Sequence, residues 1–174
     1  MKNVELKYPT KIRPVFFADA MLGSIARKLR VLGFDTLYIR DINDDDILEI
    51  ASKQDRVILT CDKELFKRIL KIGAYGALLD GSNDLDNLIY IFVKYSIKAV
   101  DLDTNCSRCV ACNGFLEHKG ITEIDGNSIP PRIRMHYKEI FRCTCCNKSY
   151  WKGSHFQQLR KMAKLIEARL KSSP

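Results

Sequence analysis

The alternation of short apolar runs with helix-like segments over the first hundred residues constrains the fold more than any other feature of the sequence. The segments between the runs carry apolar residues at helical spacing, and Gly33 and Gly73 stand where two helices should end. Strands that alternate with helices of this length predict βαβ units, a parallel sheet and an α/β fold. The runs that predict strands are RPVFFA (13–18), DTLYIR (35–40), RVILT (56–60) and YGALL (75–79).

The sequence changes character near Asn105. Before it, we expect a helix over about 84–95 and a short strand at IKAVD (97–101). After it come paired cysteines, short strand-like pieces and a basic amphipathic helix, HFQQLRKMAKLIEARLK. This change predicts two domains, residues 1–104 and residues 105–174. The last helix should face the protein core through residues at helical spacing, namely Phe156, Leu159, Met162, Ile166 and Leu170.

Positive charge is concentrated in the second region. The chain has a formal net charge of +8, yet residues 1–100 carry 16 Lys and Arg against 14 Asp and Glu. From residue 130 to the end the count is 11 basic to 2 acidic residues. A basic tail beside a nearly neutral domain favours a polyanionic partner, RNA or DNA above all, and the plainer alternative is a solvated basic surface.

The compartment follows from two absences in the sequence. No apolar run approaches the length needed to span a bilayer. The first residues, MKNVELKYPTKIRP, carry charges without the apolar core of a signal peptide. We therefore expect a cytoplasmic protein with no membrane partner.

Seven cysteines, six of them between residues 106 and 146, favour metal binding over a disulfide framework. A tetrahedral zinc site needs two Cys-x-x-Cys pairs brought together by the fold. The cluster CTCCNK allows one such pair, Cys143 with Cys146. The cluster CSRCVACNG allows two, Cys106 with Cys109 or Cys109 with Cys112.

The turn after each pair decides between these choices. The backbone turns sharply after the second cysteine of a zinc knuckle, where residues that tolerate a left-handed conformation are favoured. Asn113 follows Cys112 and Asn147 follows Cys146, whereas Val110 follows Cys109. Four thiolates leave no open position for a substrate, so a zinc site here should be structural. The alternative to a zinc site is a set of reduced buried thiols. We predict one zinc ion on Cys109, Cys112, Cys143 and Cys146.

Acidic residues follow the predicted strands of the first region. Asp19 ends FFAD, Asp62 ends VILTCD and Asp80 ends GALLD, while Asp44 opens the acidic start of a helix, NDDDILEIA. Parallel topology would bring these strand ends to one edge of the sheet. A divalent cation with oxygen ligands relieves the repulsion among gathered carboxylates and supports phosphoryl hydrolysis.

Each aspartate also has a local explanation. Asp62 and Asp44 stand at helix starts, where an aspartate caps free N–H groups and suits the helix dipole. Asp19 is harder to explain locally, because it leaves a buried apolar run and precedes AMLG. The three together favour a metal site more than any one of them does.

Four segments of the chain resemble a known family: FFADAMLGSIARKLRVLGFDTLYIRD, DDDILEIASKQDRVILTCDKELF, RCVACNG and FRCTCCNKSYWKGSHF. They look like the PIN-like ribonuclease family named for the C-terminal domain of the Mut-seven exonuclease, over about residues 15–156. The resemblance implies a PIN-like domain with a parallel β-sheet flanked by helices, then a small zinc ribbon and a basic C-terminal helix. It also implies a metal-dependent acidic site and RNA as the substrate.

The resemblance assigns the acids of the site position by position. It places them at Asp19 in FAD, at Asp44 in the pattern D-x-x-I-L and at Asp62 in T-x-D, where they would hold Mg²⁺ or Mn²⁺. The fourth acid usual in PIN-like sites has two candidates, Asp80 and Asp84. The zinc cysteines implied by the family coincide with the four chosen above.

The chain departs from the family pattern at three cysteines. Cys61 stands where T-x-D commonly has a basic residue, so a local phosphate contact is missing there. Cys106 and Cys145 are additional to the pattern. The segment YWKGSH matches, which gives weight to Ser154 and to His155, expected to touch RNA or to brace the ribbon.

These observations predict a metal-dependent ribonuclease whose ribbon and basic tail bind the RNA backbone. The alternative is a non-catalytic RNA- or ribosome-binding protein on the same scaffold, and a nuclease that matures ribosomal RNA is a variant of the first. A solvated helix face is the plainer explanation for the basic residues of the helix predicted over MLGSIARKLRVLG (21–33), namely Arg27, Lys28 and Arg30. The residues expected to contact RNA are Arg27, Arg30, Lys148, Lys152, His155 and Arg160.

Overall fold

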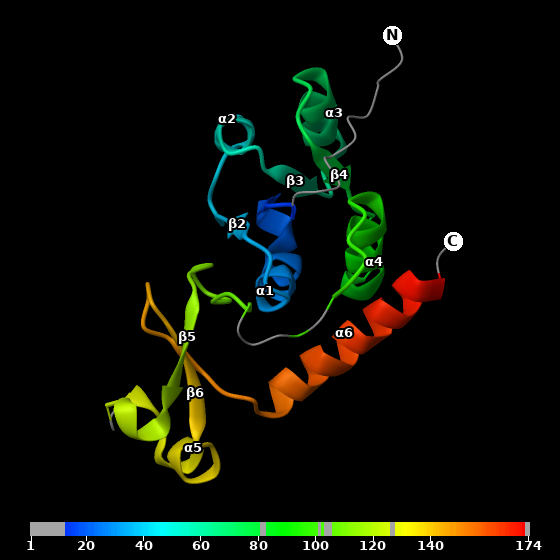
Figure 1. The fold of residues 1–174 in the computed structure, drawn as a ribbon. Coiled ribbons are helices and arrows are strands. Elements are labelled where there is room, and N and C mark those ends of the chain that lie inside the picture. Colours follow the sequence, from blue (N-terminus) through cyan, green and yellow to red (C-terminus); the bar gives the residue numbers. More distant parts are fainter. Residues whose placement is uncertain (1–12, 81–82, 101, 103–105, 126–127, 173–174) are drawn as a thin grey trace.

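The computed structural model describes residues 13–80, 83–100, 102, 106–125 and 128–172. A parallel sheet lies in the first half of the chain and an antiparallel sheet near the C-terminus (Figure 1). The first half comprises β1 (Phe16–Ala18), a 3-10 turn η1 (Ala20–Leu22), α1 (Gly23–Val31), β2 (Thr36–Tyr38), α2 (Asp44–Lys53), β3 (Val57–Thr60), α3 (Lys63–Lys71), β4 (Gly76–Leu78) and α4 (Asp84–Lys94). The second comprises β5 (Leu116–Gly120), η2 (Ile121–Glu123), α5 (Pro131–His136), β6 (Glu139–Cys143), β7 (Ser149–Tyr150) and α6 (Ser154–Ser172).

The first sheet has the strand order β2-β1-β3-β4, and all its neighbours are parallel. Phe16 of β1 stands opposite Thr36 of β2 and Val57 of β3, so the three strands end at nearly the same level. Each strand lies within one of the four predicted runs. The predicted α/β fold with a parallel sheet flanked by helices is therefore confirmed.

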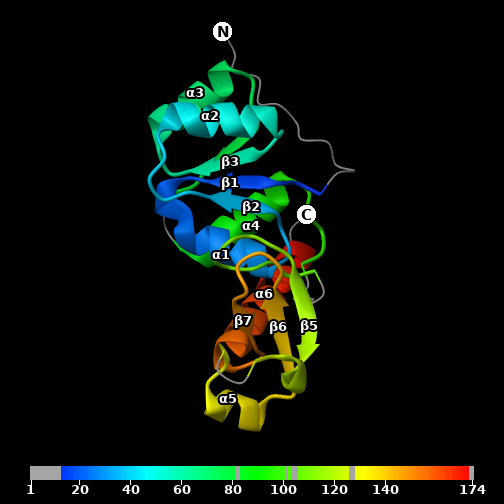
Figure 2. The same cartoon turned by 90° about the vertical axis from the view of Figure 1, so that its left-hand side faces the viewer.

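Helices cover both faces of this sheet (Figure 2). On one face, Phe16, Ala18 and Leu59 pack with α1 and α4 into the main core. On the other face, Phe17 and Ile58 pack with α2 and α3 into a second core. Burial on both faces explains why the strands read as continuous apolar runs.

Glycines follow α1 and α3 as the sequence predicts, but the segment after α4 differs from the prediction. Gly33 and Gly73 adopt left-handed conformations, with φ of 82° and 67°, just after α1 and α3. The predicted strand at IKAVD is wrong for its described residues 97–100, which are not in a strand, and residue 101 lies outside the described residues. Instead the Ile97 N–H donates to the carbonyl of Phe92 and closes α4.

The ribbon is the antiparallel sheet β5-β6-β7 with a small core of its own. Ile124, Ile129 and Ile140 are buried there, and Tyr137 and Trp151 pack against them. In both views the ribbon lies beyond α1, on the side of the molecule away from α2 and α3 (Figures 1 and 2).

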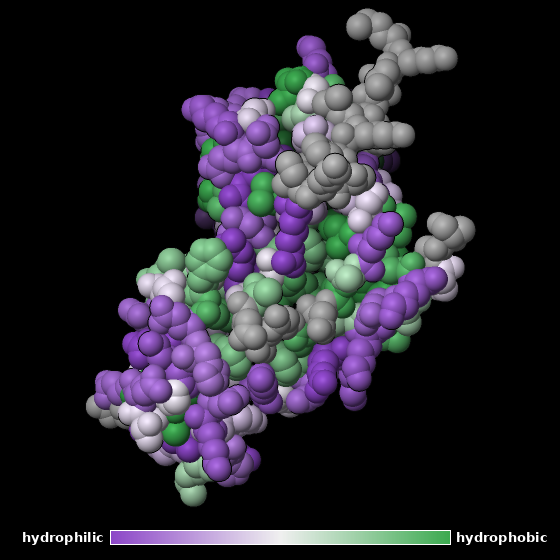
Figure 3. Space-filling view, viewed as in Figure 1, coloured by the Kyte–Doolittle hydropathy of each residue, from purple (hydrophilic) through white to green (hydrophobic). Residues whose placement is uncertain are grey.

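The last helix returns to the first half of the molecule. Ala163 and Ile166 of α6 are buried in the main core, with Met162 and Leu170 packed against it. The Arg169 guanidinium also donates to the Asp86 carboxylate of α4 at 2.7 Å. Hydrophilic side chains cover the outer side of α6 (Figure 3). The amphipathic helix predicted from the sequence is therefore confirmed, and three of its five predicted core residues, Met162, Ile166 and Leu170, reach the main core.

Candidate active site and metal centre

The carboxyl ends of the parallel strands carry the aspartates expected from the sequence. Asp19 directly follows β1, and Asp62 follows β3 after one intervening residue. Asp44 is the first residue of α2, the helix after β2, and Asp80 lies two residues beyond β4. Because β2, β1 and β3 are neighbours, these acids belong to one edge of the sheet.

A threonine hydroxyl connects two of these acids. The buried Thr60 hydroxyl donates to Oδ2 of Asp19 at 2.8 Å and accepts the backbone N–H of Asp62 at 2.9 Å. Oδ1 of Asp19 accepts the N–H of Ala20 at 2.5 Å. The position of Asp19 is therefore fixed from both carboxylate oxygens, and Asp62 is tied to the same hydroxyl through its backbone.

Asp62 is the N-cap of α3. Its Oδ1 accepts the N–H groups of Glu64 at 2.6 Å and Leu65 at 3.1 Å. The residue is exposed, and its hydrogen bonds among the described residues leave Oδ2 for another ligand. Capping and ligand binding are thus compatible at this side chain.

Asp44 lies in the first turn of α2 and faces a cation of α3. The Arg68 guanidinium donates to Oδ2 of Asp44 at 3.3 Å and pairs as well with Asp45. Asn43, rather than Asp44, caps the helix, because its side chain accepts the N–H of Asp46. The capping explanation for Asp44 is therefore wrong, since Asn43 occupies the cap position.

The three assigned acids do not form a compact ligand group by themselves. Among the described residues, sets of three or more His, Cys, Asp or Glu with all ligand atoms within 4.8 Å comprise the four cysteines and no group of aspartates. Carboxylates have the hard oxygen atoms that Mg²⁺ and Mn²⁺ prefer. Mg²⁺ is usually held by one or two carboxylates together with waters and substrate phosphates, so the donor set fits such an ion.

The two candidates for a fourth acid differ in their surroundings. Asp84, at the start of α4, pairs with Lys28 and accepts the Ser24 hydroxyl at 2.5 Å. Burial by itself would raise the pKa of Asp84, but these hydrogen bonds and the Lys28 charge lower it below its usual value. Asp80 is exposed and lies near the Cys61 thiol. The pKa of Cys61 is raised above its usual value, first by burial of the thiol and then by the negative charges of Asp19 and Asp80.

The four cysteines predicted to hold zinc converge. The Sγ atoms of Cys109 and Cys146 are 3.5 Å apart and those of Cys112 and Cys143 are 3.4 Å apart. All four sulfurs lie within 4.8 Å of one another, which suits a tetrahedral zinc ion. Among the described residues this group contains the four cysteines predicted and does not include Cys106.

The backbone around the sulfurs has the turns on which the sequence-based choice depended. Asn113 and Asn147, which follow the second cysteine of each pair, adopt left-handed conformations with φ of 69° and 58°. A Cβ at Gly114 would lie 2.8 Å from the sulfur of Cys145 and 3.0 Å from that of Cys143, so a glycine lets the backbone pass close to both sulfurs. Turn chemistry therefore identified the pairs.

Cys109 has the surroundings of a thiolate. Burial would raise its pKa, but the hydroxyl of Tyr150, at 3.0 Å, and the N–H groups of Cys112 and Ala111 lower it to about 6. A stabilised thiolate is the form that binds zinc.

The first zinc knuckle, the turn that carries Cys109 and Cys112, is attached to α1 and to the start of β2 by buried polar groups. The guanidinium of Arg30 donates hydrogen bonds to the carbonyl oxygens of Thr36, Val110 and Ala111. Asp35, just before β2, accepts the Asn113 amide at 2.9 Å. The prediction that Arg30 contacts RNA needs correction, because the residue is only 4% exposed and holds the knuckle instead.

The other residues expected to contact RNA lie on the surface. Arg27 of α1 and His155 of α6 are exposed, and both line a cavity between α1 and the ribbon. Lys148, Lys152 and Arg160 are exposed on the ribbon and on α6. Their exposure allows contact with a ligand.

Comparison with known protein families agrees with this architecture. A model of the Mut7-C RNAse domain matches residues 14–163, which include the parallel sheet, the four cysteines and the start of α6. The chain belongs to the Mut7-C RNAse domain family. No curated protein and no solved structure matches it significantly. Within the described part of this Mut7-C RNAse domain protein, none of the helices has the length and apolar character needed to cross a bilayer.

Sequence reasoning missed Thr60, although the T-x-D pattern contained it. It also missed the attachment of the first knuckle through Arg30 and Asp35, which joins residues about eighty positions apart in the chain. No local pattern signals such a contact, because a lone arginine in an amphipathic helix is typical of an exposed face.

Proposed function

We propose that this Mut7-C RNAse domain protein is a metal-dependent ribonuclease that hydrolyses phosphodiester bonds at Asp19, Asp44 and Asp62. The observation that carries the proposal is the strand order β2-β1-β3, which brings the three acids to one edge of a parallel sheet. The family match supports the same chemistry. Asp80 and Asp84 are the two candidates for a fourth acid, and Asp84 is paired with Lys28.

These acids would hold Mg²⁺ or Mn²⁺ through their carboxylate oxygens. A divalent cation bound there would offset the charge that develops on the phosphoryl group and promote attack by water. Thr60 holds Asp19 in place, and the N-cap bonds of Asp62 use Oδ1 and leave Oδ2 for a ligand. Arg68 holds Asp44 and offsets part of the negative charge of the edge.

The zinc site has a separate, structural role in this proposal. Four thiolates fill a tetrahedral coordination sphere and leave no position for substrate. The ribbon and α6, within residues 105–174, would bind the RNA backbone through the exposed cations Lys148, Lys152 and Arg160. The binding should weaken as salt rises, because phosphate contacts release counterions. We also propose that the protein is located in the cytoplasm.

Replacement of Asp19 by Asn tests the proposed site. The variant keeps the size of the side chain and removes its charge, so cleavage of RNA in Mg²⁺ should fall about 100-fold or more. Asp55→Asn is the matched control, because Asp55 is exposed and lies before β3, at the opposite end of the strand. Unchanged cleavage by folded, zinc-loaded Asp19→Asn would overturn the site.

A non-catalytic RNA- or ribosome-binding protein is the second candidate. The observation that favours it is the engagement of both Asp19 oxygens in hydrogen bonds, together with the lack of a compact group among the three acids. This function predicts salt-sensitive RNA binding that persists without Mg²⁺ and in Asp19→Asn. Cleavage and binding measured on the same preparations, with zinc content checked, separate the two functions.

A further inference from the structure

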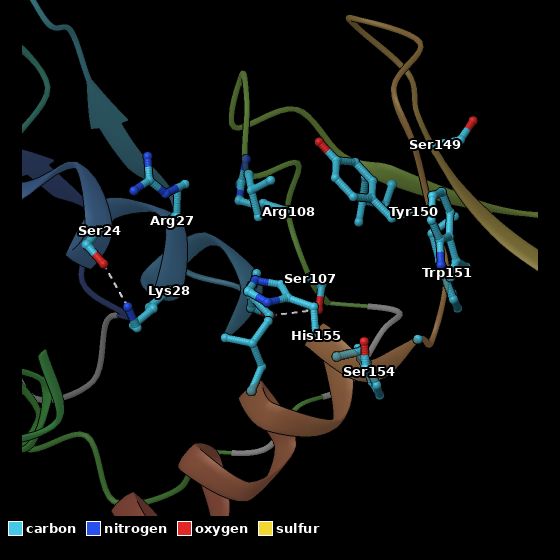
Figure 4. A pocket seen from close by; sticks show the side chains of 17 residues that line it. Ser24, Arg27, Lys28, Ser107, Arg108, Ser149, Tyr150, Trp151, Ser154 and His155 are labelled. Carbon is cyan, nitrogen blue, oxygen red and sulfur yellow. Dashed lines mark hydrogen bonds between the residues drawn. The ribbon is translucent and has the colours of Figure 1, made fainter. Parts of the chain in front are cut away.

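A cavity of about 560 Å³ lies where α1, the first zinc knuckle, the ribbon sheet and the start of α6 meet. It is separate from the strand-end acids and from the sulfurs of the zinc centre, because none of those residues lines it. Figure 4 shows side chains from α1 on one side and Tyr150 and Trp151 on the other, with His155 between them. Two domains therefore supply its walls.

The ribbon side of the cavity is aromatic. Tyr150, Trp151 and Phe156 line it, and all three are partly exposed rather than buried. Tyr150 is held by its hydroxyl, which lies 3.0 Å from the sulfur of Cys109. Trp151 packs near Tyr137, with ring centroids 6.4 Å apart. Fixed, half-exposed rings are suited to stack against a flat ligand.

The opposite side of the cavity is basic. Arg27 is exposed there, and Lys28 lines the same wall while it pairs with Asp84 and donates to the Ser24 hydroxyl at 2.7 Å. His155 projects between the two sides (Figure 4). An apolar, aromatic pocket with cations on one wall matches a nucleotide, which has a flat base and an anionic phosphate.

We propose that this cavity binds an unpaired nucleotide of single-stranded RNA, with its base against Tyr150, Trp151 and Phe156 and its phosphate near Arg27 and His155. The inference deepens the proposed function by naming the substrate as single-stranded. In a duplex the faces of each base are covered by neighbouring bases, so such a pocket selects unpaired residues.

The position of the cavity fits a strand that continues to the acid edge. Ser24 lines the cavity, lies in the first turn of α1 and donates to Asp84 at the start of α4. Asp19 precedes Ser24 by five residues, roughly 10 Å along the 3-10 turn and helix. RNA anchored between ribbon and α1 therefore lies within reach of the strand ends.

Trp151 supplies the readout, because it is the one tryptophan in the chain. Zinc-loaded full-length protein is titrated with short single-stranded RNA of mixed sequence in buffer without Mg²⁺ or Mn²⁺, so that cleavage is suppressed. We expect saturable quenching of tryptophan emission that follows binding measured by fluorescence anisotropy. A duplex of the same sequence should bind without this quenching.

Phe156→Leu removes stacking and keeps apolar volume. It should weaken binding of single-stranded RNA about tenfold. Phe115→Leu is the matched control, since Phe115 is an exposed ring, 65% accessible, that does not line the cavity. For the basic wall, Arg27→Ala should weaken binding more than Lys164→Ala, a change of an exposed cation of α6 outside the cavity.

The outcomes separate this inference from the proposed function. Quenching by single-stranded RNA without any cleavage in Mg²⁺ would support the cavity and overturn the nuclease. Cleavage without quenching, with Phe156→Leu equal to Phe115→Leu, would overturn the cavity and leave the nuclease standing. Equal quenching by the duplex would overturn the selection of unpaired nucleotides.

Discussion

The cysteine centre and the aspartate edge were both inferred from residues far apart in the chain, but they are built differently. The four sulfurs converge within 4.8 Å, whereas the three aspartates share an edge without forming such a group. Each aspartate also has a local partner: Thr60, the α3 N-terminus or Arg68. A ligand set is recognisable from sequence when its spacing and its turn residues together leave one geometry, and less so when each member also has an ordinary structural task.

The largest expected effect concerns the converged site. Cys112→Ser should lose zinc and with it the order of the ribbon, because structural zinc supplies roughly 10 kcal/mol of folding free energy in small zinc domains. Metal analysis and thermal unfolding measure both effects. Cys145→Ser is the matched control, since Cys145 is exposed and outside the ligand set. Loss of zinc in the control alone would contradict the assignment.

At the acid edge, two replacements of Asp62 separate its two roles. Asp62→Asn keeps an oxygen for the N–H groups of Glu64 and Leu65 and removes the charge, so cleavage should fall about 100-fold with little change in stability. Asp62→Ala should show the same loss of cleavage and in addition about 1 kcal/mol lower stability, from the lost cap. Equal cleavage by Asp62→Asn and the unaltered protein would leave capping as its only role.

Thr60 tests whether the edge is positioned by its hydroxyl. Thr60→Val leaves the Asp62 N–H and the Asp19 carboxylate without this partner, and it should lower stability by about 1–3 kcal/mol. For a positioning residue, kcat should fall while KM for RNA changes little, and Thr60→Ser should restore both kcat and stability. A Thr60→Ser variant as impaired as Thr60→Val would argue against the hydroxyl.

The smallest effect concerns the pair of Asp84 with Lys28. Because the pKa of Asp84 is lower in the folded protein than its usual value, the carboxylate adds stability at neutral pH. That contribution is lost as pH falls below the usual value and through the folded pKa. Asp84→Asn should therefore cost at most about 1 kcal/mol at pH 7, and the difference from the unaltered protein should vanish in acid.

Urea unfolding across this pH range measures the effect of Asp84, with Lys28→Met completing a double-mutant cycle. A cost that stays constant down to acid pH would show that the charge of Asp84 is not involved. If Asp84→Asn stays folded but cleaves RNA much more slowly than the unaltered protein, Asp84 would instead be favoured as the fourth acid.

Local chemistry made most of the fold predictable. Alternating apolar runs located four strands, and Asn113 and Asn147 located the zinc knuckles because their backbone tolerates a left-handed turn. Ile97 was misjudged, since a β-branched residue in an apolar run suits a strand or the closure of a helix against the core. Whether such a residue forms a strand depends on whether a neighbouring strand is available to pair with it, and that is decided by the tertiary fold.

The candidate sites were less predictable where they are assembled from residues far apart in the sequence. Arg30 looked like a surface cation, and only the folded chain shows its bonds to residues 110 and 111. The cavity takes one wall from α1 and another from α6, more than a hundred residues later. No window of sequence contains both walls, so the pattern of residues could not show it.

The place of α6 in the main core has a consequence for synthesis of the protein. Ala163 and Ile166 complete the core that begins with Phe16, so the first strand lacks part of its core until α6 has been translated. Until α6 leaves the ribosome, the apolar face of α4 that α6 will cover remains open to chaperones and to other chains. Zinc captured by residues 109–146 before α6 emerges would hold the ribbon ready for the docking of α6.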